Sequence, residues 1–350
     1  MLFVRRGLQC AEALLGALIL CLLCAWWVYA ARFRGEAKVP GLGNFEENVR
    51  KLPPVANDRF RFAVLGDPHE GQCIYQELMR RAFDLGAAFV VCTGDLVDGA
   101  TRESFELFNH MYKELGPAAL PMFTAIGNHD ECPQRLFEEY YGPEDFAFLH
   151  GDSVFIFTNN NNAGRHEQCA RFVKEQIARF KDRARHVFVV FHKPIVDHLW
   201  HGRMTANRRK SAYMYEVLDS EKVDAVLMGH FHGYVREMYK GTLLLVTGGA
   251  GYRLHDDNGF YHLVLIDVAP EGITDTLVRL DARRRLRDLV RVEAVVGYPV
   301  VFGSWWRLLS ALLVGTLLLL DGARRLLRKQ QGDSPLGIDG PPTPSRTAPP

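Results

Sequence analysis

The stretch RFRFAVLGDPH, residues 59–69, decides the fold. Its first part is an apolar run rich in strand-forming residues, and the run stops abruptly at glycine, aspartate and histidine. Helix-period segments separate it from further apolar runs, and this alternation predicts βαβ units with a largely parallel sheet. The expected strands are 59–66, 89–93, 122–126, 154–158 and 187–191, and the expected helices are 72–85, 104–115, 133–140 and 168–179.

The later part of this region has a different pattern. Four more expected strands, at 223–228, 242–247, 261–268 and 274–280, follow one another without long helices between them. Short connections favour antiparallel pairing, so we expect a second, more antiparallel sheet. The sequence therefore predicts an α/β fold in which two sheets lie face to face with helices outside.

Polar side chains follow five of the expected strands at the point where each strand ends. A single Gly-Asp pair is usually a turn. Loops at the carboxyl ends of parallel strands converge on one crevice, however, so five such clusters in order predict one shared site. Carboxylates, imidazoles and an amide are ligands that hydrolytic divalent metals use. The clusters are Gly66-Asp67-Pro68-His69, Gly94-Asp95, Gly127-Asn128-His129-Asp130, His192 and Gly229-His230-Phe231-His232.

With these clusters the chain resembles the calcineurin-like metallophosphoesterase superfamily over residues 59–268. That family's pattern is Asp-x-His, Gly-Asp, Gly-Asn-His-Asp/Glu, a lone His and Gly-His-x-His. The resemblance implies a metallophosphoesterase-type α/β/β/α sandwich of two mixed sheets. It also implies a hydrolase of phosphoric ester bonds that uses two divalent metal ions, with Mn, Fe and Zn as the candidates.

The resemblance also implies a role for each polar residue. His129 would be the catalytic histidine, with Asp130 or Asp95 orienting it. A hydroxide that bridges the two metals would attack phosphorus, and protonated His129 would act as general acid on the leaving alkoxide. One metal would be held by Asp67, His69 and His232 and the second by Asn128, His192 and His230, with Asp95 bridging the two.

Two features near these clusters are expected to be structural. Asp98 is interpreted as a loop-capping residue rather than a metal ligand. The run Gly248-Gly249-Ala250-Gly251 could cradle a phosphate, but a tight turn is the favoured interpretation.

The chain begins with an apolar segment. Ala13–Ala31 is a run of nineteen residues without a charge, close to the roughly 20 residues that cross a hydrocarbon core. The run is longer than the apolar part of a typical signal peptide, so residues 1–34 are interpreted as an uncleaved membrane anchor. A signal peptide cleaved after Val28-Tyr29-Ala30 is the alternative.

A second apolar segment, Val300–Leu320, has Arg307 as its only charge. Because Leu308–Leu320 lacks a polar face, we expect a second transmembrane helix at 300–320, with a core helix docked on the globular domain as the alternative. Basic tails outside both segments favour an inner or plasma membrane with the catalytic domain extracytoplasmic.

Composition completes the expected organisation. The 42 Lys and Arg against 41 Asp and Glu give no basic field for a nucleic-acid backbone, so no nucleic-acid partner is expected. One disulfide among Cys73, Cys132 and Cys169 is left open. The remaining parts are a linker at 35–58, the metallophosphoesterase domain at 59–282, a basic linker at 283–299, and a basic juxtamembrane segment with a disordered tail at 321–350.

The sequence thus predicts a membrane-anchored, dinuclear-metal phosphoester hydrolase, and the anchor favours an amphiphilic substrate. A phosphodiesterase specific for a lipid or glycan precursor is the alternative within the same chemistry. A catalytically inactive membrane scaffold of the same fold is the alternative from another class, and it is disfavoured because no expected ligand is missing.

Overall fold

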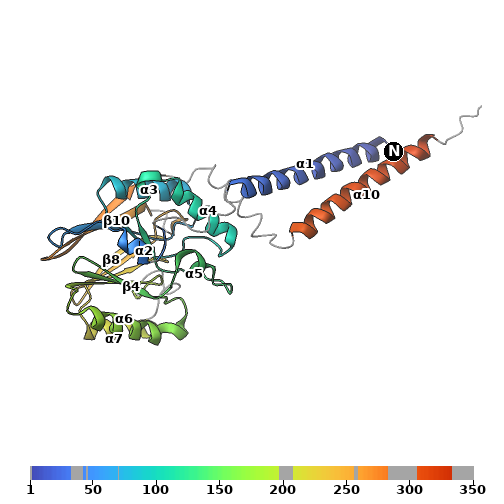
Figure 1. Cartoon of the computed structure of the whole chain (residues 1–350). Coiled ribbons are helices and arrows are strands. Elements are labelled where there is room, and N and C mark those ends of the chain that lie inside the picture. Colours follow the sequence, from blue (N-terminus) through green and yellow to red (C-terminus); the bar gives the residue numbers. More distant parts are fainter. Residues whose placement is uncertain are drawn as a thin grey trace, which may run out of the picture. The chain divides into compact units, whose positions relative to one another are not determined.

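The structure is a computed structural model that describes residues 2–32, 42–44, 46–69, 71–196, 208–255, 259–282 and 306–332. The chain divides into two compact units (Figure 1). One consists of Met1–Trp27 with Phe302–Pro350, and the other is Val28–Val301. All five predicted polar clusters belong to the second, globular unit.

The first sheet of the globular unit has the strand order β11-β10-β1-β2-β3. β1, β2 and β3 run parallel, and β10 joins β1 antiparallel, with Val64 opposite Val264. The bounds are β1 (Phe60–Leu65), β2 (Val90–Cys92), β3 (Met122–Thr124), β10 (Tyr261–Ala269) and β11 (Gly272–Leu280).

The second sheet has the order β4-β5-β6-β7-β9-β8, in which β5, β6, β7 and β9 run parallel. β4 and β8 pair antiparallel at its two edges. The bounds are β4 (Phe146–His150), β5 (Ser153–Phe157), β6 (His186–Val190), β7 (Ala225–Met228), β8 (Tyr234–Tyr239) and β9 (Thr242–Thr247).

Both sheets are mixed, as expected, but the predicted division of strands between them was wrong. The later strands do not form a sheet of their own, because β10 and β11 return to the first sheet while β7 and β9 extend the second. β5 and β6 likewise leave the first sheet for the second. Runs that are apolar on both faces carry no pattern that says which neighbour they pair with.

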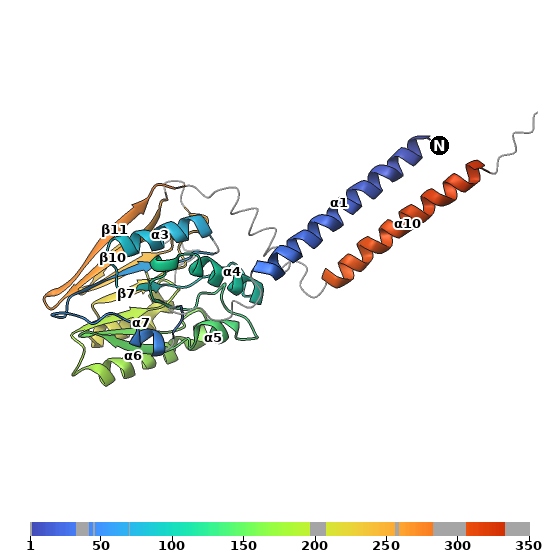
Figure 2. The ribbon, with the colours of Figure 1, turned by 45° about the horizontal axis from the view of Figure 1, so that its top comes forward.

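Helices cover the outer faces of the two sheets. Figure 2 shows α3 (Gln72–Asp84) and α4 (Arg102–Lys113) on the side of the first sheet, and α6 (His166–Phe180) and α7 (Arg208–Ser220) on the side of the second. Two short helices, α2 (Glu46–Arg50) and α5 (Leu136–Tyr141), complete the unit. The sequence did not predict α2, α7, β4 or β8.

Side-chain alternation along β1 explains the layers. Ala63 and Leu65 pack with the residues of α3 and α4, whereas Phe62 and Val64 point into a core between the sheets. In that core the rings of Phe62 and Phe155 lie edge to face with centroids 5.1 Å apart. Aromatic packing of this kind fixes the two sheets against each other, so that the loops at the strand ends are held in place.

The segment expected to be a linker before β1 contributes to this packing. Leu42 belongs to the core beneath α3 and α4. The side-chain amide of Asn44 donates to the Thr124 carbonyl and accepts from the Thr124 backbone N–H, both at 2.9 Å. This pairing extends the edge of β3 toward the third polar cluster.

The seven cysteines are all unpaired, so the disulfide left open by the sequence is absent from the structure. Cys169 is buried on α6, where its thiol donates to the Asn159 carbonyl at 2.9 Å.

The helical unit contains α10 (Trp306–Gly332) and, up to Trp27, the helix α1 (Leu2–Arg32). Arg324 of α10 pairs with Glu12 of α1 at 2.6 Å. Within the described ranges, no helix combines the length and the apolar character that crossing a membrane requires, so the two predicted spans are not confirmed. The first residues of the second span, 300–305, lie outside the described residues, as do the predicted linker 283–299 and the tail 333–350.

Candidate metal centre

The polar clusters lie at the carboxyl ends of five parallel strands. They follow β1, β2 and β3 of the first sheet and β6 and β7 of the second. Six of the seven predicted metal ligands fall into two groups whose ligand atoms lie within 4.8 Å of one another. The groups are Asp67, His69, Asp95 and His232, and Asp95, His192 and His230, while a third group joins His69 to Asp98 and His129.

Asp95 is the residue common to both groups. Its Oδ2 lies 3.4 Å from Nε2 of His69 and 3.2 Å from Nε2 of His192. His192 is also 3.1 Å from Nδ1 of His230, while His232 lies 3.4 Å from a carboxylate oxygen of Asp67. Asp95 is thus the residue closest to both groups, while Asn128, the seventh predicted ligand, belongs to neither of them.

Four of these residues have a left-handed backbone. The φ angles are 57° for Asp67, 38° for His69, 54° for Asp95 and 68° for His230. Residues with a side chain rarely adopt such angles, and those that do cluster at functional sites. Hydrogen bonds from backbone N–H groups to site carboxylates hold this conformation, for example from the His230 N–H to both carboxylate oxygens of Asp67, at 3.1 and 3.0 Å.

At two positions in the clusters only glycine fits, because neighbouring atoms lie too close to leave room for a Cβ. A Cβ on Gly127 would lie 2.0 Å from Oδ1 of Asp95. Gly94 has a φ of 103°, and a Cβ there would lie 2.8 Å from Nδ1 of His192. Glycine therefore lets the loops after β2 and β3 approach the site without displacing its ligands.

Several buried atoms of the site fit a metal. Oδ1 of Asn128 and Nδ1 of His232 are buried without a hydrogen-bond partner, and the two ring nitrogens of His69 lie 3.4 Å from the carboxylates of Asp95 and Asp98. Polar atoms in such positions cost free energy unless something satisfies them. Bound cations would do so, because oxygen and imidazole nitrogen form the donor set that Mn, Fe and Zn accept.

A sequence model of the family described as "Calcineurin-like phosphoesterase" matches residues 60–234, half of the chain. The chain belongs to the calcineurin-like phosphoesterase family. The family's name is that of phosphoesterases, and the described residues of this chain include candidate groups of metal ligands.

One curated relative of this phosphoesterase is the probable glycerophosphodiester phosphodiesterase GpdQ of Arcobacter nitrofigilis, 23% identical over 180 residues. The match covers 47% of this chain and 64% of the relative's length.

Two solved structures are also similar. Both have a TM-score of 0.49 and cover 68% of this chain. One is the anchor protein GAP50 of the Plasmodium inner membrane complex, which is 16% identical and has 95% of its chain covered. The other is the purple acid phosphatase PPD1 of yellow lupin, which is 14% identical and has 56% of its chain covered.

The histidines of the site differ in their pKa values. Burial opposes a charge on the His69 ring, but the carboxylates of Asp95 and Asp98 outweigh it and raise the pKa of His69 to about 10. Burial acts likewise on His192, yet Asp95 raises its pKa to about 9. Burial and the nearby charge of His192 instead lower the pKa of His230 to about 3. A cation that binds here therefore displaces protons from His69 and His192.

His129 differs from the ligands in being partly exposed, with 39% of its side chain accessible. Its Nδ1 lies 2.8 Å from the backbone carbonyl of Asp98 and 3.6 Å from the Asp98 carboxylate. A carbonyl oxygen only accepts, so Nδ1 carries the proton of this contact. Asp98, which the sequence analysis interpreted as a loop cap, is thus the residue that orients the His129 ring.

The prediction that Asp130 or Asp95 orients this ring needs correction. Asp130 is fully buried and accepts from the backbone N–H groups of Gly127 and Val97, at 2.9 and 3.2 Å. Burial and the charge of Asp95 raise its pKa to about 7. Asp95 does meet His129, but through the backbone N–H at 2.9 Å. The carboxylates of Asp130 and Asp95 thus accept hydrogen bonds from the backbone of the loop after β3 and fix its conformation.

Two neighbours of the ligands were missed from the sequence. Tyr252 stacks on the His69 ring with centroids 4.1 Å apart, and its backbone N–H donates to the Asp67 carbonyl. It follows the glycine run 248–251, which packs against the end of β1 through a hydrogen bond from the Ala250 N–H to the Gly66 carbonyl. The other is the run of four asparagines at 159–162, directly after β5, whose composition was a signal that the sequence analysis did not use.

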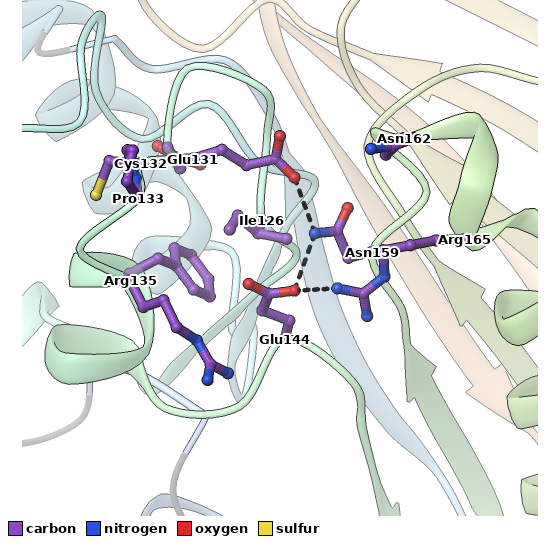
Figure 3. Close-up of a pocket in the computed structure, with 11 residues that line it drawn as sticks. Ile126, Glu131, Cys132, Pro133, Arg135, Glu144, Asn159, Asn162 and Arg165 are labelled. Carbon is purple, nitrogen blue, oxygen red and sulfur yellow. Dashed lines mark hydrogen bonds and ion pairs between the residues drawn. The ribbon is translucent and has the colours of Figure 1, made fainter.

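A cavity of about 400 Å³ adjoins the loop after β3, where Ile126 and Asp130 form part of its wall. Figure 3 shows two carboxylates of this cavity, those of Glu131 and Glu144, directed at the amide of Asn159. The Asn159 amide donates to both, at 3.0 and 2.9 Å. Arg165 pairs with Glu144 at 2.6 Å, and Ile126, Pro133 and Phe137 add apolar side chains to the wall.

Proposed function

We propose that this phosphoesterase hydrolyses a phosphodiester at a dinuclear metal site. Asp67, His69 and His232 would hold one cation, and Asn128, His192 and His230 the other. Asp95 would be shared between them. The observation that carries the proposal is the pair of ligand groups that overlap only at this one carboxylate.

The two cations, when bound, would supply hydroxide near neutral pH and neutralise charge on the phosphoryl oxygens. The chain itself would supply the proton for the leaving alkoxide. His129 suits that role because its ring is partly exposed while Nδ1 is held by the Asp98 carbonyl. The ring is thus oriented on one side and accessible to a substrate on the other.

We favour a diester over a monoester as the class of substrate. The relative from Arcobacter nitrofigilis carries the name of a glycerophosphodiester phosphodiesterase, which supports the same class of substrate.

A membrane anchor at residues 1–34 completes the proposal. Its support is the sequence, in the uncharged run Ala13–Ala31, and Val300–Leu320 is the candidate for a second span. The catalytic unit would lie on the extracytoplasmic side of an inner or plasma membrane, where amphiphilic substrates are concentrated. Alkaline carbonate extraction of membranes tests this. The full chain should stay in the pellet, and its release into the supernatant would refute the anchor.

The activity test uses the full chain purified in detergent and freed of metal with a chelator. Bis(p-nitrophenyl) phosphate, p-nitrophenyl phosphate and glycerophosphoglycerol are compared with and without added Mn²⁺. We expect hydrolysis that depends on Mn²⁺ and prefers the diesters. His129→Ala should lose it, while His110→Ala, a histidine on α4 bonded to Glu114, should keep it. A faster rate on the monoester would overturn the diester assignment. A folded chain with two bound metals and no turnover on any of the three would favour the scaffold.

A further inference from the structure

Three consecutive asparagines after β5 connect the two loops that carry the second group of ligands. We propose that Asn159, Asn160 and Asn161 are positioning residues that hold Asn128 and His192 at the spacing the second cation needs. This inference rests on the proposed dinuclear site and adds residues that neither the family pattern nor the ligand groups contain.

Asn160 holds the loop after β6. Its Nδ2 donates to the Lys193 carbonyl at 2.8 Å, and its Oδ1 accepts from the Lys193 backbone N–H at 2.9 Å. Lys193 directly follows His192, so both backbone polar groups of this residue are fixed next to a ligand. Asn160 is 3% exposed, and its Nδ2 also lies 3.2 Å from the hydroxyl of Tyr213 on α7. Buried hydrogen bonds of this kind are costly to leave unmade.

Asn161 holds the loop after β3. Its Nδ2 donates to the Ile126 carbonyl at 3.0 Å, two residues before Asn128, and lies 3.3 Å from the Glu131 carboxylate. The backbone carbonyl of Asn161 accepts from Nζ of Lys193 at 2.7 Å. Asn161 therefore contacts both the loop after β3 and the loop after β6, which lie on either side of the second ligand group.

Asn159 fixes the conformation of the run itself. Its Oδ1 accepts from the Asn161 backbone N–H at 2.9 Å, while its Nδ2 donates to Glu131 on the far side of the loop after β3. The local turn sets the direction of the Asn161 side chain, as asparagine often does for the residue two positions on. The three amides thus act as one connection between the loops.

Asparagine suits this connection because its amide carries no charge and can donate and accept at once, as those of Asn159 and Asn160 do. Aspartate has nearly the same shape but offers no donor and would add a buried negative charge. The hydrogen bonds that these three asparagines make within the described residues reach neither Asp67 nor His69 nor His232. Their loss should therefore affect the second cation and spare the first.

The test is a titration of Mn²⁺ into the metal-free full chain, followed by calorimetry, with bound metal counted by elemental analysis. Wild type should bind two ions. Asn160→Asp and Asn161→Ala should each weaken one of the two sites by about 10–100-fold, the usual cost of removing a group that supports a ligand, and leave the other within about threefold. Activity at low Mn²⁺ should fall and then recover as Mn²⁺ is raised.

Asn162→Ala is the matched control. Asn162 is exposed, and its side chain accepts only from the Gly164 backbone N–H among the described residues. It should bind both ions as wild type does. Two unchanged sites in both variants would overturn the inference. Equal weakening of both sites with a lowered melting temperature would also overturn it, because the role would then be general stability. A wild type that binds fewer than two ions would refute the dinuclear site itself.

Discussion

The two halves of the metal centre are built in different ways. Around Asp67 and His69, left-handed backbone and a stacked ring, that of Tyr252, hold the ligands in place. Around His192, the support comes from side-chain amides that reach over from the end of β5. The first half is thus supported by the segment after β9 that carries Tyr252, and the second by the segment after β5, while His230 of the second half shares the left-handed backbone. Substitutions away from the ligands should be able to separate the two cations.

The largest effect should come from the residue that the halves share. Asp95→Asn keeps the shape of the side chain but removes the charge and one acceptor, so both cations lose a ligand. We expect metal content below two ions per chain and a fall in kcat/KM on the order of 10³-fold or more. Measured on bis(p-nitrophenyl) phosphate with Mn²⁺, a loss smaller than about tenfold would show that the carboxylate is not shared.

His129→Ala should leave both halves loaded and impair only the chemistry. Loss of a general acid typically costs about 10²–10⁴-fold in rate. The loss should be larger for glycerophosphoglycerol than for bis(p-nitrophenyl) phosphate, because p-nitrophenolate leaves readily without a proton. Equal losses on the two diesters would contradict proton donation by this ring.

Metal affinity should rise with pH. The pKa of His69 is raised to about 10 and that of His192 to about 9, so both rings carry protons in the metal-free site at neutral pH. A cation must displace these protons, hence raising the pH favours binding. Between pH 6 and 8 we expect the Kd for Mn²⁺ to fall by about tenfold per pH unit for each proton released. Calorimetry in buffers of different ionisation enthalpy counts the protons, and a count of zero would refute this electrostatic description.

The smallest effect is expected on the first half alone. Tyr252→Leu removes the ring stacked on His69 and should weaken only the first cation, by about 3–10-fold, the equivalent of one aromatic pair. It is the counterpart of Asn160→Asp in the second half. If the two variants weaken the same site, the division of the centre into two independently supported halves is wrong.

Much of the site was predictable because ligands follow strand ends in an ordered pattern. Asp67, Asp95 and His192 each come directly after a glycine or an apolar run, and their convergence follows from parallel strands. The division of strands between sheets was not predictable, since β10 is apolar on both faces. β8 was missed because it is a half-exposed edge strand with charged residues.

The residues that support the ligands were harder to predict than the ligands. Asp98 reaches His129 mainly through a backbone carbonyl, which no side-chain pattern encodes. Tyr252 contacts His69 across 183 positions of chain, and only the fold brings the two together. The asparagine run 159–162 was visible in the sequence, but its purpose depends on the loops beside it.

The most direct test of a shared carboxylate between two ligand groups is anomalous diffraction from crystals of the Mn²⁺-loaded protein. We predict two peaks roughly 3.5–4 Å apart, one on each side of Asp95, as in other two-metal hydrolases. A single peak, or two peaks that do not both contact Asp95, would contradict the dinuclear centre described here.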